Sequence, residues 1–264
     1  MGEMEKEPMI SKSIAAIIVT AVLLGHGVGA DAAEVKVLCA NGMRAVLTEL
    51  HPQLERTTGQ RVTMNFGEAG HLRTRIQDGE MVDVIVLPRV VLDQLLTQDK
   101  IVPGTTVDLG QSGMGLGVRT DAPNPDIGSA EGLKRALLAA KSIAITDPAT
   151  GGVSGVHIAE VFQRLGIAEE LKPKLKLNRG GPNAAFVVRG EADMAIQLAH
   201  EIRAVPGIDF VPLPVEFQKT FVFSAGLAPN AKESVPAKAL LQFLSGRESM
   251  TVIRAKGMDP VAGK

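Results

Sequence analysis

The sequence predicts an α/β fold with two lobes that close on each other as a clamshell. Two series of alternating strands and helices follow one another along the chain, and two extended segments connect them. Glycine-framed turns stand where several predicted strands pass into helices. Because ligands of such sheets bind beyond the carboxyl ends of the strands, the space between the lobes is the expected binding site.

The first 32 residues have the features of a secretory signal peptide. Residues 14–24 form an uncharged apolar run, shorter than the roughly 20 residues that span a bilayer. Lys12 precedes this run, and Ala30-Asp31-Ala32 follows it as a small-x-small cleavage site. We therefore expect export and cleavage, with an uncleaved membrane anchor as the alternative.

The mature chain is expected to be a periplasmic monomer that is not inserted in the membrane. Met9 is the better translation start, because three glutamates make residues 1–8 acidic. The chain holds 28 basic and 29 acidic residues, and removing the leader's two lysines and four acids leaves it near neutrality. It therefore lacks the excess of positive charge that is typical of a nucleic-acid-binding protein. Cys39 is the only cysteine, so an internal disulfide is excluded.

The first series alternates three strands with three helices, which predicts parallel pairing with helices on both faces of the sheet. Pro52 falls inside the first helix and should kink or restart it. The expected strands are residues 35–39, 61–66 and 82–87, and the expected helices are residues 43–58, 72–78 and 90–98.

A glycine-rich run at residues 113–118 connects the two series. Its spacing is G-x-G-x-G and no helix follows, so we interpret it as a crossing between lobes and not as a dinucleotide-binding loop. The second series predicts helices at residues 130–139, 156–165 and 183–188, and strands at 142–145, 194–197 and 210–213. Residues 220–225 return the chain to lobe 1, where helices at 236–245 and 249–255 complete it. Lobe 1 is thus expected at 34–112 and 223–264, and lobe 2 at 113–222.

The turns after the strands are candidate anion sites, because a helix N-terminus presents free N–H groups and partial positive charge. Three polar turns without a catalytic set indicate a binding protein for a small anion, with no catalytic residue. The candidate ligand-binding residues are Asn41, Gly42, Met43, Ala69, Gly70 and Arg89 on lobe 1, and Gly151, Gly152, Ser154, Gly155, Asn183 and Gln197 on lobe 2.

Several of these residues have a simpler structural interpretation. Asn41 and Gly42 suit a plain turn, and Ser154 suits a helix N-cap. Glu68 would repel an anion, so it is expected to be solvated, to bind a cation or to hold an arginine. His200 stands alone, and a lone histidine does not make a metal site. We expect neither a metal nor a cofactor.

Four motifs resemble those of the molybdate-type periplasmic binding proteins, the solute receptors of ABC importers. They are Ala40-Asn41-Gly42, Phe66-Gly67-Glu68-Ala69-Gly70, Asp83-Val84 and Asp147-Pro148. The resemblance covers nearly the whole mature chain in element order. It implies the type 2 periplasmic-binding-protein clamshell, in which each lobe is a mixed sheet flanked by helices and two hinge crossings join the lobes. It also implies delivery of the solute to an ABC permease and its ATPase complex.

The resemblance is weaker where the family's oxyanion-binding members carry hydroxyl groups. Their serine after the first strand falls at Gly42, their serines after the second at 68–70, and their second-lobe tyrosine near Leu198. Buried oxyanion oxygens need donors, so this loss argues against tight binding of molybdate or tungstate. The glycines should also leave room in the cleft. We therefore prefer a di- or tricarboxylate over molybdate.

An enzyme on the same fold is the alternative function. Residues 152–156 approach the G-x-S-x-G nucleophile elbow but lack its final glycine, and the sequence does not make Asp147 and His157 triad partners. Some transferases and thiamin-degrading enzymes share this clamshell, so the fold alone does not exclude chemistry on a small periplasmic substrate.

Overall fold

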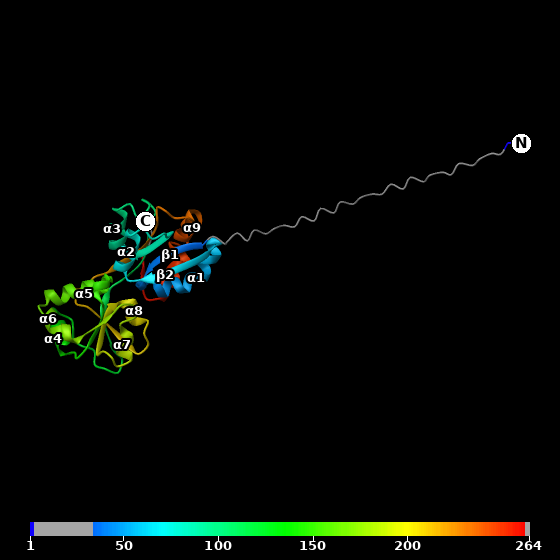
Figure 1. Ribbon diagram of the computed structural model, residues 1–264. Coiled ribbons are helices and arrows are strands. Elements are labelled where there is room, and N and C mark those ends of the chain that lie inside the picture. Colours follow the sequence, from blue (N-terminus) through cyan, green and yellow to red (C-terminus); the bar gives the residue numbers. More distant parts are fainter. Residues whose placement is uncertain (3–33, 262–264) are drawn as a thin grey trace. The chain divides into compact units, whose positions relative to one another are not determined.

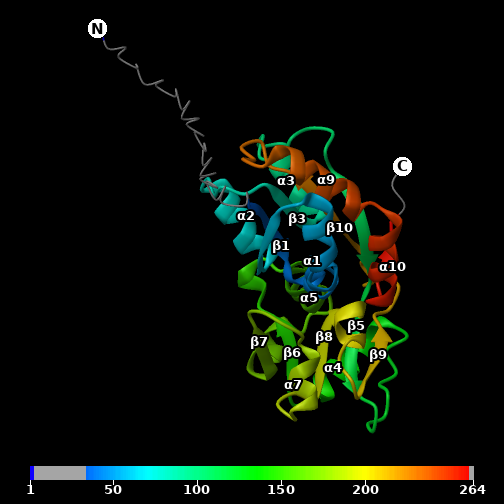
Figure 2. The ribbon, with the colours of Figure 1, turned by 90° about the vertical axis from the view of Figure 1, so that its right-hand side faces the viewer.

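The computed structural model describes residues 1–2 and 34–261, so nearly all of the expected leader lies outside the described residues. The described chain builds two sheets, which Figures 1 and 2 show as separate groups of strands. The first sheet has six strands in the order β11-β4-β10-β3-β1-β2, and the second has five in the order β7-β6-β8-β5-β9. We call the first sheet with its helices lobe 1, and the second sheet with its helices lobe 2.

The sheet of lobe 1 is mixed. Its strand β1 pairs in parallel with β2 and β3, as the alternating pattern predicts. Strand β10 pairs antiparallel with both β3 and β4, and β4 and β11 are strands that the sequence analysis did not predict. The bounds are β1 (Glu34–Ala40), β2 (Arg61–Gly67), β3 (Val84–Pro88), β4 (Val107–Ser112), β10 (Phe221–Leu227) and β11 (Asp259–Pro260).

The helices of lobe 1 agree with the predicted ones in place and order. Pro52 lies inside α1, which continues through it, so the expected restart is wrong. Val46, Leu47, Leu50 and Leu54 form the buried face of α1, and this burial outweighs the hydrogen bond that proline removes. The bounds are η1 (Asn41–Met43), α1 (Arg44–Thr58), α2 (Ala69–Gln77), α3 (Arg89–Leu96), α9 (Ser234–Leu244) and α10 (Arg247–Ala255).

Lobe 2 is also a mixed sheet with helices around it. Strand β6 pairs in parallel with β7 and β8, whereas β5 pairs antiparallel with β8 and β9. The strands are β5 (Met114–Arg119), β6 (Ile143–Thr146), β7 (Leu175–Asn178), β8 (Met194–Leu198) and β9 (Ile208–Pro212). The helices are α4 (Ala130–Ala139), η2 (Pro148–Thr150), α5 (Val153–Arg164), α6 (Ala168–Leu171), η3 (Lys172–Lys174), α7 (Ala184–Val188) and α8 (Ala199–Arg203).

The glycine-rich run is mostly a strand and not a free linker. Only Gly113 separates β4 from β5, and Gly115 lies inside the sheet. A Cβ at Gly115 would come within 2.4 Å of the Val211 carbonyl oxygen, so this glycine allows close packing. Gln218, which precedes β10 on the second crossing, is hydrogen-bonded to Met114 at the start of β5 on the first crossing. Its side-chain amide accepts from the Met114 N–H at 2.7 Å and donates to the Met114 carbonyl at 2.8 Å.

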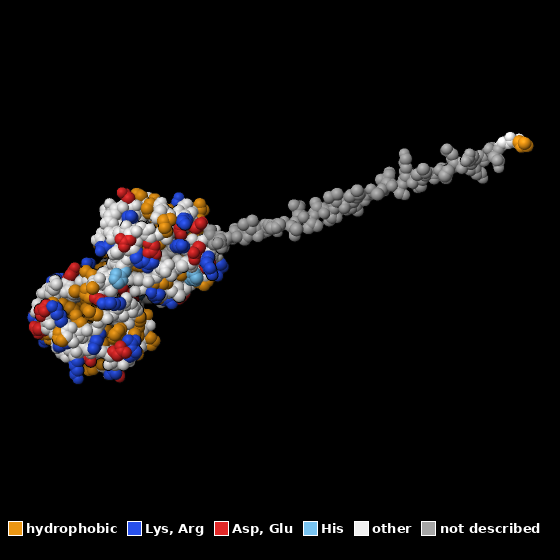
Figure 3. Space-filling model, in the orientation of Figure 1, with side chains coloured by type: hydrophobic (Ala, Val, Ile, Leu, Met, Phe, Trp, Pro, Cys, Tyr) orange, Lys and Arg blue, Asp and Glu red, His pale blue; other side chains and the backbone are white. Residues whose placement is uncertain are grey.

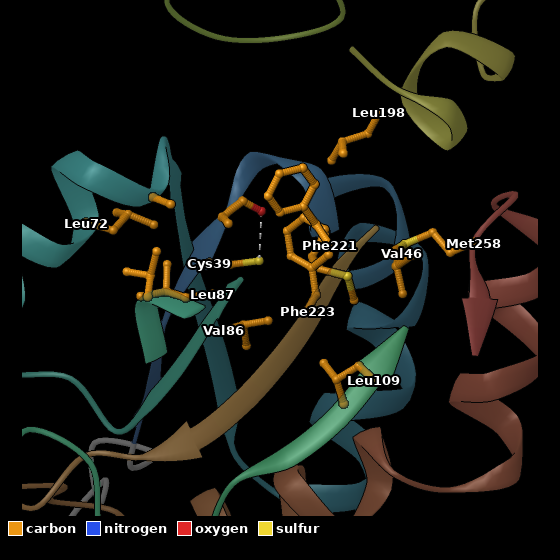
Figure 4. Packing of buried hydrophobic residues seen from close by; sticks show 14 of the residues in the cluster. Cys39, Val46, Leu72, Val86, Leu87, Leu109, Leu198, Phe221, Phe223 and Met258 are labelled. Atoms are coloured by element: carbon orange, nitrogen blue, oxygen red, sulfur yellow. Dashed lines mark hydrogen bonds between the residues drawn. The ribbon is translucent and has the colours of Figure 1, made fainter. Parts of the chain in front are cut away.

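Buried apolar side chains fill both lobes, and Figure 4 shows part of this packing around Cys39. Cys39 is fully buried, and this burial raises the pKa of its thiol far above the usual range. Acidic and basic side chains are interspersed over the face seen in Figure 3. No helix in the described part of the chain has the length and apolarity needed to cross a bilayer.

Candidate functional site

The carboxyl ends of strands from both lobes meet at a small cavity, which we call the cleft cavity. Ala40 pairs with Gly67 in the register of β1 and β2, so Asn41 and Glu68 leave their strands side by side. The cavity has a volume of about 20 Å³, roughly the room that one water needs. Its lining residues are Ala40, Asn41, Gly42, Glu68, Ala69, Pro88, Thr146, Val153, Ser154, Gln197, Leu198, Glu201 and Phe223.

Five of the candidate residues line this cavity, and two more lie where the lobes touch. Asn41, Gly42, Ala69, Ser154 and Gln197 are the lining residues. At the contact, a Cβ on Gly70 would come within 2.6 Å of both the Gly151 Cα and the Thr150 carbonyl oxygen. Glycine is therefore required at this contact for the lobes to approach so closely.

Other candidate residues do not line the cleft cavity. The Met43 side chain is fully buried in lobe 1. Arg89 is engaged within its own lobe, since it donates to Asp93 at 2.8 Å and to Asp108 at 2.9 Å. Gly155 packs against β6, where a Cβ would come within 2.3 Å of the Thr146 carbonyl oxygen.

The expectation that the glycines leave open space is wrong at two positions. A Cβ on Gly42 would come within 2.6 Å of the Phe223 ring and 3.5 Å of Leu198, and Figure 4 shows these two side chains near each other. A Cβ on Gly152 would come within 2.4 Å of Glu68 Oε2. The volume that these glycines release is thus filled by side chains of this protein.

A buried polar network holds the lobe 2 side of the cavity. Asn183 is fully buried and donates from Nδ2 to the Ile196 carbonyl at 2.9 Å, while its backbone N–H donates to Gln197 Oε1 at 2.6 Å. Ser154 donates to Thr146 Oγ1 at 3.2 Å. The N-cap of α5 is Gly152, so the N-cap role expected for Ser154 is wrong. Asn183 therefore positions the Gln197 side chain by its backbone N–H hydrogen bond and does not itself line the cavity.

Glu68 lies on the lobe 1 side of the cavity. Asn41 donates from Nδ2 to Glu68 Oε1 at 2.9 Å, and Arg44 donates to Asn41 Oδ1 at 2.8 Å. Glu68 is therefore linked to Arg44 only through Asn41, and not directly as the expectation that it holds an arginine would require. Burial raises the pKa of Glu68, against the Asn41 hydrogen bond and the charges of His71 and Arg44.

Glu201 is a second carboxyl in the cavity, and the sequence analysis did not identify it. It lies on α8, just beyond the end of β8, so its position after a buried strand was the available signal. Burial is the main cause that raises the pKa of Glu201 to about 8, and the Glu68 charge adds to it. The Leu198 backbone and the Gln197 side chain act in the opposite direction. At pH 7 Glu201 is therefore mostly protonated.

His200 bridges the lobes and is buried, with 3% of its surface exposed. Its Nε2 lies 2.8 Å from the Gly42 carbonyl oxygen, and since a carbonyl only accepts, Nε2 carries the hydrogen. Burial lowers the pKa of His200 to about 4, so the ring is neutral at pH 7. Within residues 34–261, no three His, Cys, Asp or Glu side chains are grouped to hold a metal ion.

A larger groove adjoins the cleft cavity and shares Asn41, Gly42 and Glu201 with it. This side groove has a volume of about 830 Å³ and is also lined by three cationic side chains, Arg44, Arg203 and Lys256. Arg44 lies 4.2 Å from the Phe66 ring centre and Arg203 lies 4.3 Å from that of Phe210, so both guanidinium groups rest on aromatic rings. Lys256 forms an ion pair with Glu49. Carboxyls in the cavity thus adjoin cations in the groove.

Two mixed sheets, two crossings and a site at the facing strand ends define a two-lobed periplasmic-binding-protein fold. The periplasmic molybdate-binding protein of Azotobacter vinelandii has this fold, with a TM-score of 0.71 and 20% identity over 87% of this chain and 100% of that one. A periplasmic thiamin-binding protein matches with a TM-score of 0.70 and 17% identity over 88% of this chain and 85% of that one. These likenesses show the fold alone.

The chain belongs to the bacterial extracellular solute-binding protein family, whose sequence model matches residues 35–259. The resemblance seen in the motifs is thereby confirmed. Among curated relatives, an aconitate isomerase from a Pseudomonas species is 32% identical over 85% of this chain and 87% of its own length. The molybdate-binding protein ModA of Rhodobacter capsulatus is 27% identical over 90% of this chain and 92% of its own.

Proposed function

We propose that this protein is a periplasmic receptor that binds a small organic polycarboxylic acid between its lobes and delivers it to an ABC permease and its ATPase. The observation that carries the proposal is the pairing of two carboxyls, Glu68 and Glu201, in the cleft cavity with the cationic side groove next to it. In the cleft cavity a bare tetrahedral oxyanion would lie against Glu68, which repels it, whereas a larger organic acid can extend its carboxylates to Arg44 and Arg203 in the side groove. An organic acid of several carboxyl groups suits both regions.

The two regions suit different parts of such a ligand. Arg44 and Arg203 offer charged donors to carboxylates in the side groove. Glu201, protonated at neutral pH, offers a neutral O–H to a further oxygen in the cleft cavity. The cavity holds only about 20 Å³ in the present arrangement, so we infer that the lobes separate to admit the acid. The moving bodies would be residues 34–112 with 223–264, and residues 113–222.

The comparisons support both parts of this proposal. The family is extracellular, and relatives named as molybdate-binding proteins support a transport role. The relative named as an aconitate isomerase supports a tricarboxylate, since aconitate carries three carboxyl groups. We propose that the receptor acts as a monomer in the periplasm.

A thermal-shift screen of ligand-stripped protein tests the ligand class. The panel holds trans-aconitate, citrate and tricarballylate beside molybdate, tungstate, sulfate and phosphate. A ligand at 100 times its dissociation constant stabilises the fold by about 2.7 kcal/mol. We expect this with at least one tricarboxylate and not with molybdate. Stabilisation by molybdate alone contradicts the proposal, and stabilisation by none of these anions contradicts an anionic ligand.

An enzyme that isomerises an unsaturated carboxylic acid is the second candidate function. The specific observation in its favour is the presence of one protonated carboxyl and one ionisable carboxyl in the same cavity, which is the combination that acid–base chemistry requires. The isomerase relative supports it as well. Incubation of substoichiometric protein with trans-aconitate, followed by NMR of the products, separates a catalyst from a receptor.

A further inference from the structure

We propose that Glu68 and Glu201 act together on a bound unsaturated acid, Glu68 taking a proton from one carbon and Glu201 giving a proton to another. This inference rests on the proposed binding of an organic acid in the cleft. It assigns roles to two named side chains and predicts proton exchange whether the protein's main task is transport or isomerisation.

The first support is the composition of the cavity lining. Of its lining residues, Glu68 and Glu201 are the two that titrate, while Asn41, Ser154 and Gln197 contribute neutral amide and hydroxyl groups. The two carboxyls come from opposite lobes and line the same cavity. An acid bound between the lobes, after they separate to admit it, therefore meets one carboxyl from each lobe.

The second support is the way in which Glu68 is held. Asn41 donates to Oε1 at 2.9 Å, and Arg44 fixes the Asn41 amide by donating to its Oδ1. The other oxygen, Oε2, faces Gly152 of lobe 2, where a Cβ would come within 2.4 Å of it. One oxygen is therefore anchored by a hydrogen bond, and the other is directed across the cleft through the space that a glycine provides.

The third support is the difference in protonation. Glu201 keeps its proton at pH 7 because burial and the Glu68 charge raise its pKa to about 8. Burial raises the pKa of Glu68 as well, but Asn41, His71 and Arg44 favour its ionised form. A pair of interacting carboxyls that shares one proton supplies one acid and one base at neutral pH.

The chemistry that fits is a shift of a carbon–carbon double bond. Glu68 removes a proton from a CH₂ group that lies between a carboxyl and an alkene carbon. The C–H electron pair forms the new double bond, the old one shifts its pair to the far carbon, and that carbon takes the proton of Glu201. The ligand keeps its composition, Glu68 ends protonated and Glu201 ends ionised. One proton passing from Glu68 to Glu201 restores the starting state.

Hydrogen–deuterium exchange tests the proposal directly. Wild-type protein in D₂O is incubated with trans-aconitate, and ¹H NMR follows the loss of the carbon-bound hydrogen signals. Tricarballylate, a saturated analogue without the double bond, measures binding by calorimetry in the same samples. We expect exchange with trans-aconitate, and we expect Glu68→Gln and Glu201→Gln each to slow it by about 10²–10⁴-fold while tricarballylate binding changes less than 10-fold. Glu169→Gln, an exposed glutamate paired with Lys172, is the matched control and should exchange like wild type.

The outcomes separate the inference from the proposed function. If tricarballylate binds but trans-aconitate exchanges no faster than in buffer, the proton-transfer roles are wrong and the receptor function stands. If exchange persists in both variants, another group does the chemistry and the inference is overturned. If neither acid binds, both proposals fail.

The pH profile of wild-type exchange gives a readout that does not depend on the folding of variants. The rate should fall above about pH 8, where Glu201 loses its proton, and should fall in acid, where Glu68 gains one. The neighbouring groups are His71 and Arg44 around Glu68, and His200 and Arg203 on the same helix as Glu201. A rate that rises steadily from pH 5 to pH 10 would indicate hydroxide chemistry and would contradict the assignment.

Discussion

His200 of lobe 2 donates from Nε2 to the Gly42 carbonyl oxygen of lobe 1 at 2.8 Å, and the imidazole is almost fully buried where it does so. This hydrogen bond joins the two lobes next to the cleft cavity. In an opened molecule, water can replace His200 at the Gly42 carbonyl, whereas in the touching arrangement the imidazole donates to it. The bond therefore favours the closed arrangement of the lobes.

His200→Phe should open the unliganded protein. The substitution keeps an aromatic ring beside Phe223 but removes the donor, and the loss of one such hydrogen bond costs about 0.5–1.5 kcal/mol. We expect a larger radius of gyration by small-angle X-ray scattering than for wild type. His200→Gln, which keeps an N–H donor, should lie closer to wild type. Identical scattering from wild type and His200→Phe would show that this bond does not hold the lobes.

Gly70→Ala should prevent the lobes from closing fully. Its Cβ would meet backbone atoms of Gly151 and Thr150 at 2.6 Å, and backbone does not move aside as a side chain tip does. We expect the affinity for tricarballylate to weaken by at least 10-fold in calorimetry, with little change in the melting temperature of the unliganded protein. Gly180→Ala is the control, because a Cβ there meets only Asn41 Nδ2 at 3.8 Å. Equal affinities for the two variants would contradict the role of this contact.

Stability should decline as pH rises from about 4.5 to about 8. The pKa of Glu201 is about 8 in the folded protein and near its ordinary value of 4.5 when unfolded, so the folded state binds more protons in this window. The favourable contribution is complete below pH 4.5 and is lost as pH rises through 8, with a size on the order of a few kcal/mol. Glu68, whose pKa is also raised, acts in the same direction.

Urea denaturation at pH 5 and pH 8 measures this decline, and Glu201→Gln should flatten it. His200 gives an opposite trend between pH 6.5 and pH 4: its pKa is lowered from 6.5 to about 4, so its contribution is complete above pH 6.5 and is lost as pH falls through this range. An unchanged urea midpoint difference between pH 5 and pH 8 in Glu201→Gln would show that this carboxyl is not the source.

Cys39 should be inert to thiol reagents in the folded protein. It lies fully buried in β1, and burial raises the pKa of its thiol, which disfavours the reactive thiolate. We expect Ellman's reagent to react at pH 8 only as fast as the protein opens, and fully in denaturant. Rapid and complete labelling of folded protein would mean that reagent reaches Cys39 and that the residues around β1 pack less tightly than in the structure.

The sequence predicts those features that depend on neighbouring residues. Alternation of strands and helices, the turn at Asn41-Gly42 and the end of α1 at Gly59 follow from local patterns. Strand β4 was missed because Asp108 and Gly110 are poor strand formers, and its pairing with β10 involves residues more than a hundred positions away.

The site was predictable only in part, for the same reason. The turns at Asn41 and Ser154 were identified because strand ends are local features. Glu201 was missed because its proximity to Glu68 depends on how the two lobes meet. Likewise, the space at Gly42 is filled by Phe223, a contact that no local pattern encodes.

Calorimetric titration of ligand-stripped wild-type protein with tricarballylate and with molybdate distinguishes a tricarboxylate receptor from a molybdate receptor. We expect saturable one-to-one binding of tricarballylate, with its carboxylates near Arg44 and Arg203, and no binding of molybdate at the same concentrations. Tight binding of molybdate with no heat from tricarballylate or trans-aconitate would contradict this expectation.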